Sequence, residues 1–191
     1  MRTFIAIEIP ERLKQNLDRS IEMLRSDLED RLIRWVRLES MHLTLNFLGE
    51  INQDQVRAIQ ELLVDVASRF SSFSLEIGGY GCFPNNTRPR VVWVGLNPVE
   101  GELLRLQSEL ATQLETIGFM REQRDYHPHL TLGRVRKGLS GDDMGSISRW
   151  AQEADIGAMW RFEVETIRLI RSVLQPDGAS YTNLHVAKLR S

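Results

Sequence analysis

The sequence contains almost no cysteine, and its single thiol, Cys82, excludes an internal disulfide. Small secreted domains often depend on disulfides, so their absence here leads us to expect a protein of the reducing cytoplasm. Proline is also scarce, with 6 residues in 191, which excludes a collagen-like or proline-rich tract. The composition therefore predicts a folded chain throughout.

Long apolar runs and an excess of positive charge are missing too. The apolar stretch within residues 1–10 is short and contains Glu8, so we expect a first strand there, with no membrane association. The 24 Lys and Arg are balanced by 26 Asp and Glu, for a net charge of −2. A long duplex is normally bound by a clustered basic face. Any nucleic-acid partner is therefore expected to be small, such as a chain end.

The hydrophobic pattern predicts alternating strands and helices. Apolar residues three or four apart predict helices near residues 11–28, 56–70, 103–117 and, more weakly, 146–153. Strands are expected near residues 2–9, 41–48, 73–77, 91–96, 129–135, 162–170 and 181–189. Glycines at positions 78, 79 and 81 are expected to end the first half, and residues 82–90 are expected to form an exposed loop.

The predicted order of elements occurs twice, as strand, helix, histidine-bearing strand, helix and strand. We therefore expect one bilobal domain over residues 1–191, with repeat halves at about 1–81 and 90–191. A cleft is expected between the two lobes. No obligate protein partner is indicated, and we expect a monomer.

The same tetrapeptide, His-Leu-Thr-Leu, begins at His42 and again at His129. Residues two apart in a strand share a face, so each histidine should project beside its threonine, Thr44 or Thr131, with the leucines buried behind. Two imidazoles at one phosphate can divide the proton transfers, because one takes a proton from water and the other protonates the leaving oxygen. The hydroxyls can donate to phosphate oxygens. The paired motif predicts a metal-independent cyclic phosphodiesterase.

Arg134 is a candidate for contact with the phosphate, because a guanidinium would stabilise the developing negative charge. It lies an odd number of residues beyond His129, so a regular strand would turn it to the opposite face. A bulge near Gly133 would redirect it toward the motif.

Aromatic side chains are candidates for stacking on a base. Tyr126, beside the second motif, is the preferred one, with Phe47 and Phe83 as further candidates, whereas Trp93 lies in an apolar run and is expected in the core. Arg90, in the central loop, is a candidate for RNA contact.

No metal or cofactor is predicted. His127 and His129 flank a proline, which suggests a metal pair, but the only ligand type nearby is Asp125. His127 is instead expected to shape the entry to the strand.

The chain resembles the two-histidine (2H) phosphoesterase superfamily and, within it, the LigT-like bacterial RNA 2′,3′-cyclic phosphodiesterases, also called 2′-5′ RNA ligases. The resemblance rests on residues 2–7, 41–49, 89–95, 127–134 and 178–181. It implies a bilobal α+β fold with antiparallel sheets, outer helices and a central cleft that carries both motifs. It further implies opening of 2′,3′-cyclic phosphate ends to 2′-phosphates, with a capacity for 2′-5′ ligation.

By the same resemblance, His42 is the proton donor and His129 the proton acceptor. Thr44, Thr131 and Arg134 are the implied phosphate contacts. The residues alone leave alternatives open: the substrate class extends to small cyclic nucleotides and ADP-ribose cyclic phosphate. A non-catalytic module that binds RNA ends and a metal hydrolase are alternatives of other classes.

Overall fold

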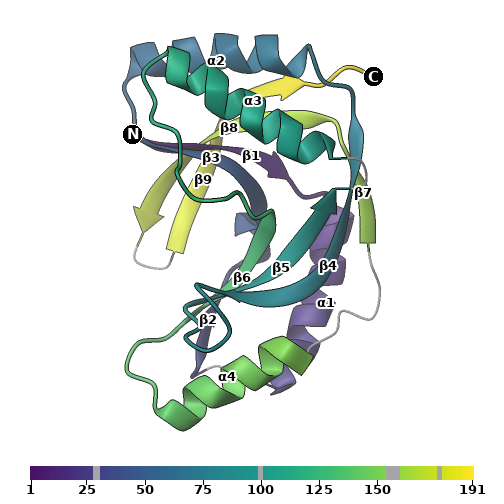
Figure 1. Cartoon of the computed structure of the whole chain (residues 1–191), viewed down its shortest axis with the longest axis vertical. Coiled ribbons are helices and arrows are strands. Elements are labelled where there is room, and N and C mark those ends of the chain that lie inside the picture. The colour runs from purple at the N-terminus through teal and green to yellow at the C-terminus, as the bar shows by residue number, and fades with distance from the viewer. Residues whose placement is uncertain (28–30, 99–100, 154–159, 176–177) are drawn as a thin grey trace.

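Two antiparallel sheets form the centre of the molecule, and helices lie outside them (Figure 1). The computed structural model describes residues 1–27, 31–98, 101–153, 160–175 and 178–191. This arrangement confirms the α+β class and the antiparallel sheets that the sequence predicted.

The first sheet has the strand order β3-β1-β8-β9. Its members are β3 (His42–Glu50), β1 (Arg2–Glu8), β8 (Thr166–Gln175) and β9 (Gly178–Lys188). The second sheet has the order β2-β6-β5-β4-β7. Its members are β2 (Ile33–Trp35), β6 (His129–Val135), β5 (Val91–Pro98), β4 (Phe73–Phe83) and β7 (Trp160–Val164). Each sheet takes strands from both halves of the sequence, so the spatial lobes differ from the sequence halves.

The predicted helices are all present among the described residues. They are α1 (Glu11–Asp27), α2 (Gln53–Ala67), α3 (Glu102–Thr116) and α4 (Gly141–Glu153), and a short 3₁₀ helix, η1 (Leu38–Ser40), precedes β3. Helix α2 contacts β8 and β9, α3 contacts β3 and β5, and α4 contacts β4. Apolar residues of the helices and strands form one continuous core between these layers.

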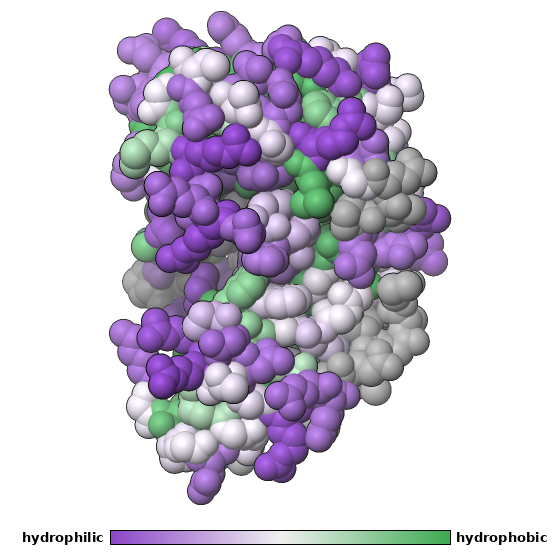
Figure 2. Space-filling model, viewed as in Figure 1, coloured by the Kyte–Doolittle hydropathy of each residue, from purple (hydrophilic) through white to green (hydrophobic). Residues whose placement is uncertain are grey.

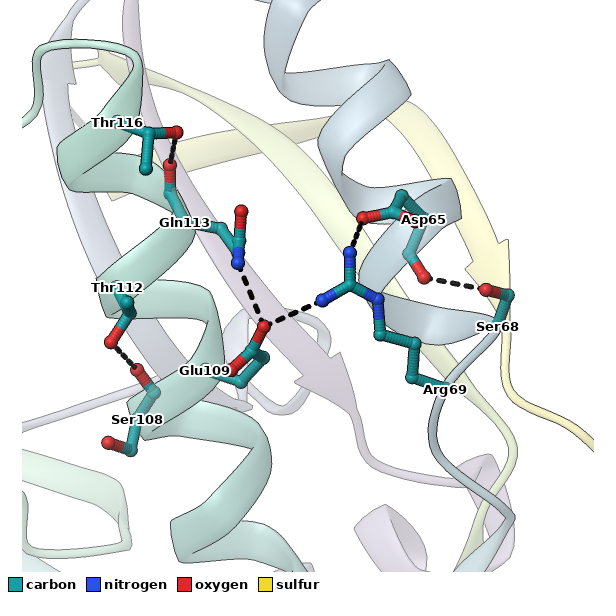
Figure 3. Close-up of polar contacts among 8 residues, drawn as sticks. All are labelled: Asp65, Ser68, Arg69, Ser108, Glu109, Thr112, Gln113 and Thr116. Carbon is teal, nitrogen blue, oxygen red and sulfur yellow. Dashed lines mark hydrogen bonds and ion pairs between the residues drawn. The ribbon is translucent and has the colours of Figure 1, made fainter.

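Polar contacts join the two helices that cover the first sheet (Figure 3). Arg69, just after α2, donates to Glu109 of α3 over 2.9 Å and also pairs with Asp65. Gln113 donates to the same Glu109 carboxylate over 3.0 Å. These contacts lie within the layer of helices, so they stabilise the packing of α2 against α3 and do not involve the opposite face of the sheet.

The glycines at positions 78, 79 and 81 do not end the first half, contrary to expectation. Strand β4 continues through them to Phe83, with a register shift between Ile77 and Tyr80. Gly79 has φ +72, a conformation that glycine adopts without strain, and so accommodates the bulge. The exposed segment between β4 and β5 is therefore confined to residues 84–90.

The surface in Figure 2 is mostly hydrophilic, and paler or apolar atoms gather across its middle. Within the described ranges, no helix has the length and apolar character needed to cross a membrane. Each histidine motif lies on a sheet face that the helices leave uncovered, the first on β3 and the second on β6.

Candidate active site

Strand β3 presents the first motif on the sheet face opposite the helices. His42 lies opposite Glu8, Thr44 opposite Ala6 and Phe47 opposite Phe4 in the ladder with β1. Directly opposed residues share a face, and we call this set of six residues the first motif face. Leu43 and Leu45 are buried in the core behind it, as the strand period predicted.

Strand β6 presents the second motif in the same way. His129 lies opposite Gly95 and Thr131 opposite Trp93, but after a register shift Arg134 lies opposite Val91. Leu132 is the extra residue of this bulge and is buried. Arg134 therefore shares a face with Thr131. A regular strand would have turned it to the opposite face, so the bulge redirects it as predicted. The second motif face consists of Phe83, Val91, Trp93, His129, Thr131 and Arg134.

Trp93 lies on the second motif face, and the expectation that it belongs to the core was wrong. Its neighbours Val92 and Val94 are fully buried, so strand alternation turns the half-buried indole to the other side. The ring packs against Phe83 at 5.2 Å between centroids and lies over Gly81, where a Cβ would approach within 2.2 Å of the indole. Glycine is thus required for the close approach of Trp93.

His42 is enclosed by two aromatic rings. Phe4 stacks on it with centroids 4.5 Å apart, and Tyr181 contacts it edge-on at 5.1 Å. Desolvation by burial lowers the pKa of His42 to about 4, a hydrogen bond with the Ser40 backbone opposes that shift, and the charge of Lys14 adds to it. The imidazole is therefore neutral in the free protein at neutral pH.

His129 has a related but more open setting. Its Nδ1 lies 2.7 Å from the carbonyl oxygen of His127, and Phe83 contacts the ring edge-on at 4.8 Å. Desolvation lowers the pKa of His129, and the bond to the His127 carbonyl opposes that shift. A proton on Nδ1 leaves Nε2 as the free base of the neutral ring. Both motif histidines thus bond to the backbone two residues earlier.

Tyr126 joins the two motif strands. Its hydroxyl donates to the backbone carbonyl of Thr44 over 3.0 Å, and its ring packs against the core. Strands β3 and β6 are also in contact. This placement favours a role in holding the two motifs together over the base stacking that the sequence suggested.

The other predicted candidates lie apart from one another. Phe47 is on the first motif face with 72% of its surface exposed and lies 6.2 Å from Phe4 between ring centroids. Arg90 is exposed, but it directly precedes Val91, so alternation turns it away from the second motif face. No group of three or more possible metal ligands occurs in the described part of the chain.

A charged group beside His42 was not predicted from the sequence. Glu8, opposite His42, pairs with Arg168 over 2.7 Å and with the buried Lys14 over 3.9 Å. These residues come from β1, β8 and α1, so only the fold brings them together. A pocket of about 310 Å³ opens beside them and is also lined by Glu163 and Glu165.

Comparisons with known proteins agree with this architecture. The model of the LigT like Phosphoesterase family matches residues 7–93 and again residues 94–181. The RNA 2′,3′-cyclic phosphodiesterase of Methanothermobacter thermautotrophicus is 33% identical over 189 residues, covering 99% of each chain. Its namesake from Archaeoglobus fulgidus is 34% identical over 186 residues, covering 97% of this chain and 99% of that protein.

Solved structures show the same fold. TT0787 of Thermus thermophilus superposes with a TM-score of 0.80 at 26% identity, covering 100% of this chain and 99% of that one. E. coli LigT complexed with 3′-AMP superposes with a TM-score of 0.79 at 25% identity, covering 100% and 98%.

Two antiparallel sheets that each present a His-x-Thr pair define a two-histidine phosphoesterase. More specifically, the chain belongs to the LigT-like phosphoesterase family, whose model accounts for both halves of the sequence.

Proposed function

We propose that this protein hydrolyses RNA 2′,3′-cyclic phosphate ends to 2′-phosphomonoesters. The observation that carries the proposal is the pair of motif faces, each with one imidazole and one hydroxyl turned away from the core. Relatives that match nearly the whole chain are named RNA 2′,3′-cyclic phosphodiesterases, which supports this substrate class over small cyclic nucleotides or ADP-ribose cyclic phosphate. If the 5′-hydroxyl of a second RNA strand attacks the cyclic phosphate in place of water and O3′ leaves, the same site forms a 2′-5′ phosphodiester.

In the proposed mechanism, neutral His129 removes a proton from the attacking water through Nε2. Its bond to the His127 carbonyl and its lowered pKa both support this role. Protonated His42 then gives its proton to the departing O3′, which leaves the phosphate on O2′. Thr44, Thr131 and Arg134 hold the non-bridging oxygens.

The donor role requires that substrate binding raise the pKa of His42. In the free protein that pKa is about 4, so few molecules carry the proton at neutral pH. A phosphate anion about 4 Å away stabilises the imidazolium by roughly 4 kcal/mol at an effective dielectric of about 20, which raises its pKa by about three units. The substrate itself thus supplies the charge that makes His42 an acid.

Phe47 is proposed to stack on a base of the RNA end. It is the most exposed aromatic ring on either motif face, and stacking on an aromatic ring tolerates any base. Trp93 and Phe83 form an aromatic wall beside His129 and supply a second apolar surface.

We propose that the protein is a monomer and that it acts in the cytoplasm; the buried and unpaired thiol of Cys82 supports the second of these proposals. Burial raises the pKa of this thiol to about 11, so it is not an activated nucleophile. Gel filtration tests the monomer, and a dimer at micromolar concentration contradicts it.

The decisive experiment is product analysis of an oligonucleotide with a 2′,3′-cyclic end. A 2′-phosphate product is expected, whereas a 3′-phosphate product contradicts the assigned leaving group. His42→Ala and His129→Ala should each lower kcat about 10²–10⁴-fold with the melting temperature little changed, and His185→Gln is the matched control outside both motif faces. Full activity in excess chelator is expected, and binding without turnover at any pH would identify a non-catalytic module instead.

A further inference from the structure

Two arginines stand directly opposite each other at the edge of the second sheet. Arg34 of β2 pairs with Arg134 of β6 in the antiparallel ladder, so their Cα atoms are roughly 5 Å apart and their side chains leave the same face. Like charges in this position destabilise a sheet. A ligand of opposite charge at this place would remove that cost.

Neither of these guanidinium groups has a carboxylate partner in the part of the chain that the structure describes. Some exposed arginines elsewhere do have one: Arg31 pairs with Asp143 over 2.9 Å, and Arg105 with Glu102 over 3.2 Å. The pair thus places two uncompensated positive charges side by side near the second motif, although the protein as a whole has a net charge of −2. Such a local excess attracts an anion.

The position of the pair follows from the bulge in β6. Because Arg134 shares the face of His129 and Thr131, Arg34 extends the same row by one strand to β2, where the sheet ends. Four ladder steps separate His129 from Arg134, or roughly 13 Å along the strand. Arg34 is therefore better placed for a second phosphate than for the one between the histidines.

We propose that Arg34 and Arg134 bind the phosphodiester that joins the terminal nucleotide to its 5′ neighbour. In this arrangement Arg134 lies between the two phosphates, and Arg34 contacts only the outer one. A planar guanidinium group suits this role because it can donate two parallel hydrogen bonds to phosphate oxygens. This inference rests on the proposed function and deepens it: the preferred substrate is an RNA strand rather than a mononucleotide.

The test compares two substrates in one assay, a dinucleotide with a 2′,3′-cyclic end and the corresponding cyclic mononucleotide, which lacks the internal phosphodiester. Arg34→Gln should lower the ratio of kcat/KM for dinucleotide over mononucleotide about tenfold. When log kcat/KM for the dinucleotide is plotted against log salt concentration, the slope for the variant should also be shallower by about 0.7. Arg57→Gln, which removes an exposed guanidinium from α2, is the matched control and should leave the ratio as in the wild type.

A dinucleotide with a neutral methylphosphonate linkage removes the same interaction from the other side. The wild type should lose about tenfold on it, and Arg34→Gln should lose nothing further, because the charge that Arg34 contacts is already gone. The inference is overturned if Arg34→Gln leaves the ratio of kcat/KM unchanged, either because neither value falls or because both fall equally on the dinucleotide and the mononucleotide. Absence of turnover of every substrate by the wild type overturns the proposed function itself, which is a separate outcome.

Discussion

The imidazole of His42 lies in stacked contact with the ring of Phe4, with 4.5 Å between centroids and 24° between the planes. Tyr181 meets the same imidazole edge-on. His129, in contrast, has an edge contact with Phe83 and a more distant one with Trp93. The two histidines of one repeated motif therefore have different surroundings, which is what two different proton-transfer roles require.

The pH dependence of turnover should differ between free and substrate-bound enzyme. Burial lowers the pKa of both histidines, so in the free enzyme His42, the proposed donor, loses its proton at a pH well below its ordinary pKa of about 6.5. We expect kcat/KM to decline as pH rises through neutrality. A bound phosphate favours the imidazolium, so the alkaline limb of kcat should lie at higher pH. Both profiles can be measured on a 2′,3′-cyclic dinucleotide, and coincident limbs above pH 7 contradict the prediction.

Phe4→Leu should raise the pKa of His42 from about 4 toward its ordinary value, because a smaller side chain admits water to the imidazole. Phe4 is 3% exposed, so the free energy of unfolding should also fall by about 1–2 kcal/mol. NMR titration of the histidine ring protons reads the pKa directly. Phe73→Leu, in the core of the second sheet, is the control that should cost stability without moving that pKa.

Tyr126→Phe removes the hydroxyl that joins the motif strands. Loss of its bond to the Thr44 carbonyl should lower the free energy of unfolding by about 1–2 kcal/mol and the melting temperature by roughly 2–8 °C. Because the bond holds β3 against β6, we expect kcat to fall more than KM changes. Thr116→Val deletes a comparable hydroxyl-to-carbonyl bond in α3. If the two variants have the same kcat, Tyr126 does not position the motifs.

Gly81→Ala should displace Trp93. The added Cβ would lie 2.2 Å from the indole, so the ring must move, and we expect a loss of about 1–3 kcal/mol in the free energy of unfolding together with lower activity. Gly145→Ala is the opposite case, because nothing lies within 4 Å of its Cβ position in α4. That change should stabilise the protein by about 1 kcal/mol, so the two melting temperatures should move in opposite directions.

Local periodicity was sufficient to predict most elements of this fold. The stripes of apolar residues predicted the helices, and the expected strand at residues 129–135 has the bounds of β6. Strand β2 was missed because it has three residues, which is too short for a period to show. One strand was expected near residues 162–170, but β7 ends at Val164 and β8 begins at Thr166, a break that no glycine or proline marks.

The site was predictable only where one strand determines it. The histidines and threonines follow from alternation within each motif, whereas the final direction of Arg134 depends on a bulge opposite Trp93 that the partner strand sets. Tyr126, adjacent to the motif in sequence, turned out to contact the other sheet. Lys14, Glu8 and Arg168 meet through tertiary structure alone, and nothing in their spacing marks them.

The exchange of strands between the two sheets has a consequence for how the chain can be divided. Strand β1 is hydrogen-bonded to β8, β2 to β6, and β4 to both β5 and β7, so neither half of the sequence contains a complete sheet. Cleavage between β4 and β5, within residues 84–90, would leave two fragments interlocked by these ladders. Each fragment would carry one of the two motif histidines and only part of each sheet, so both fragments together would be needed for a working enzyme.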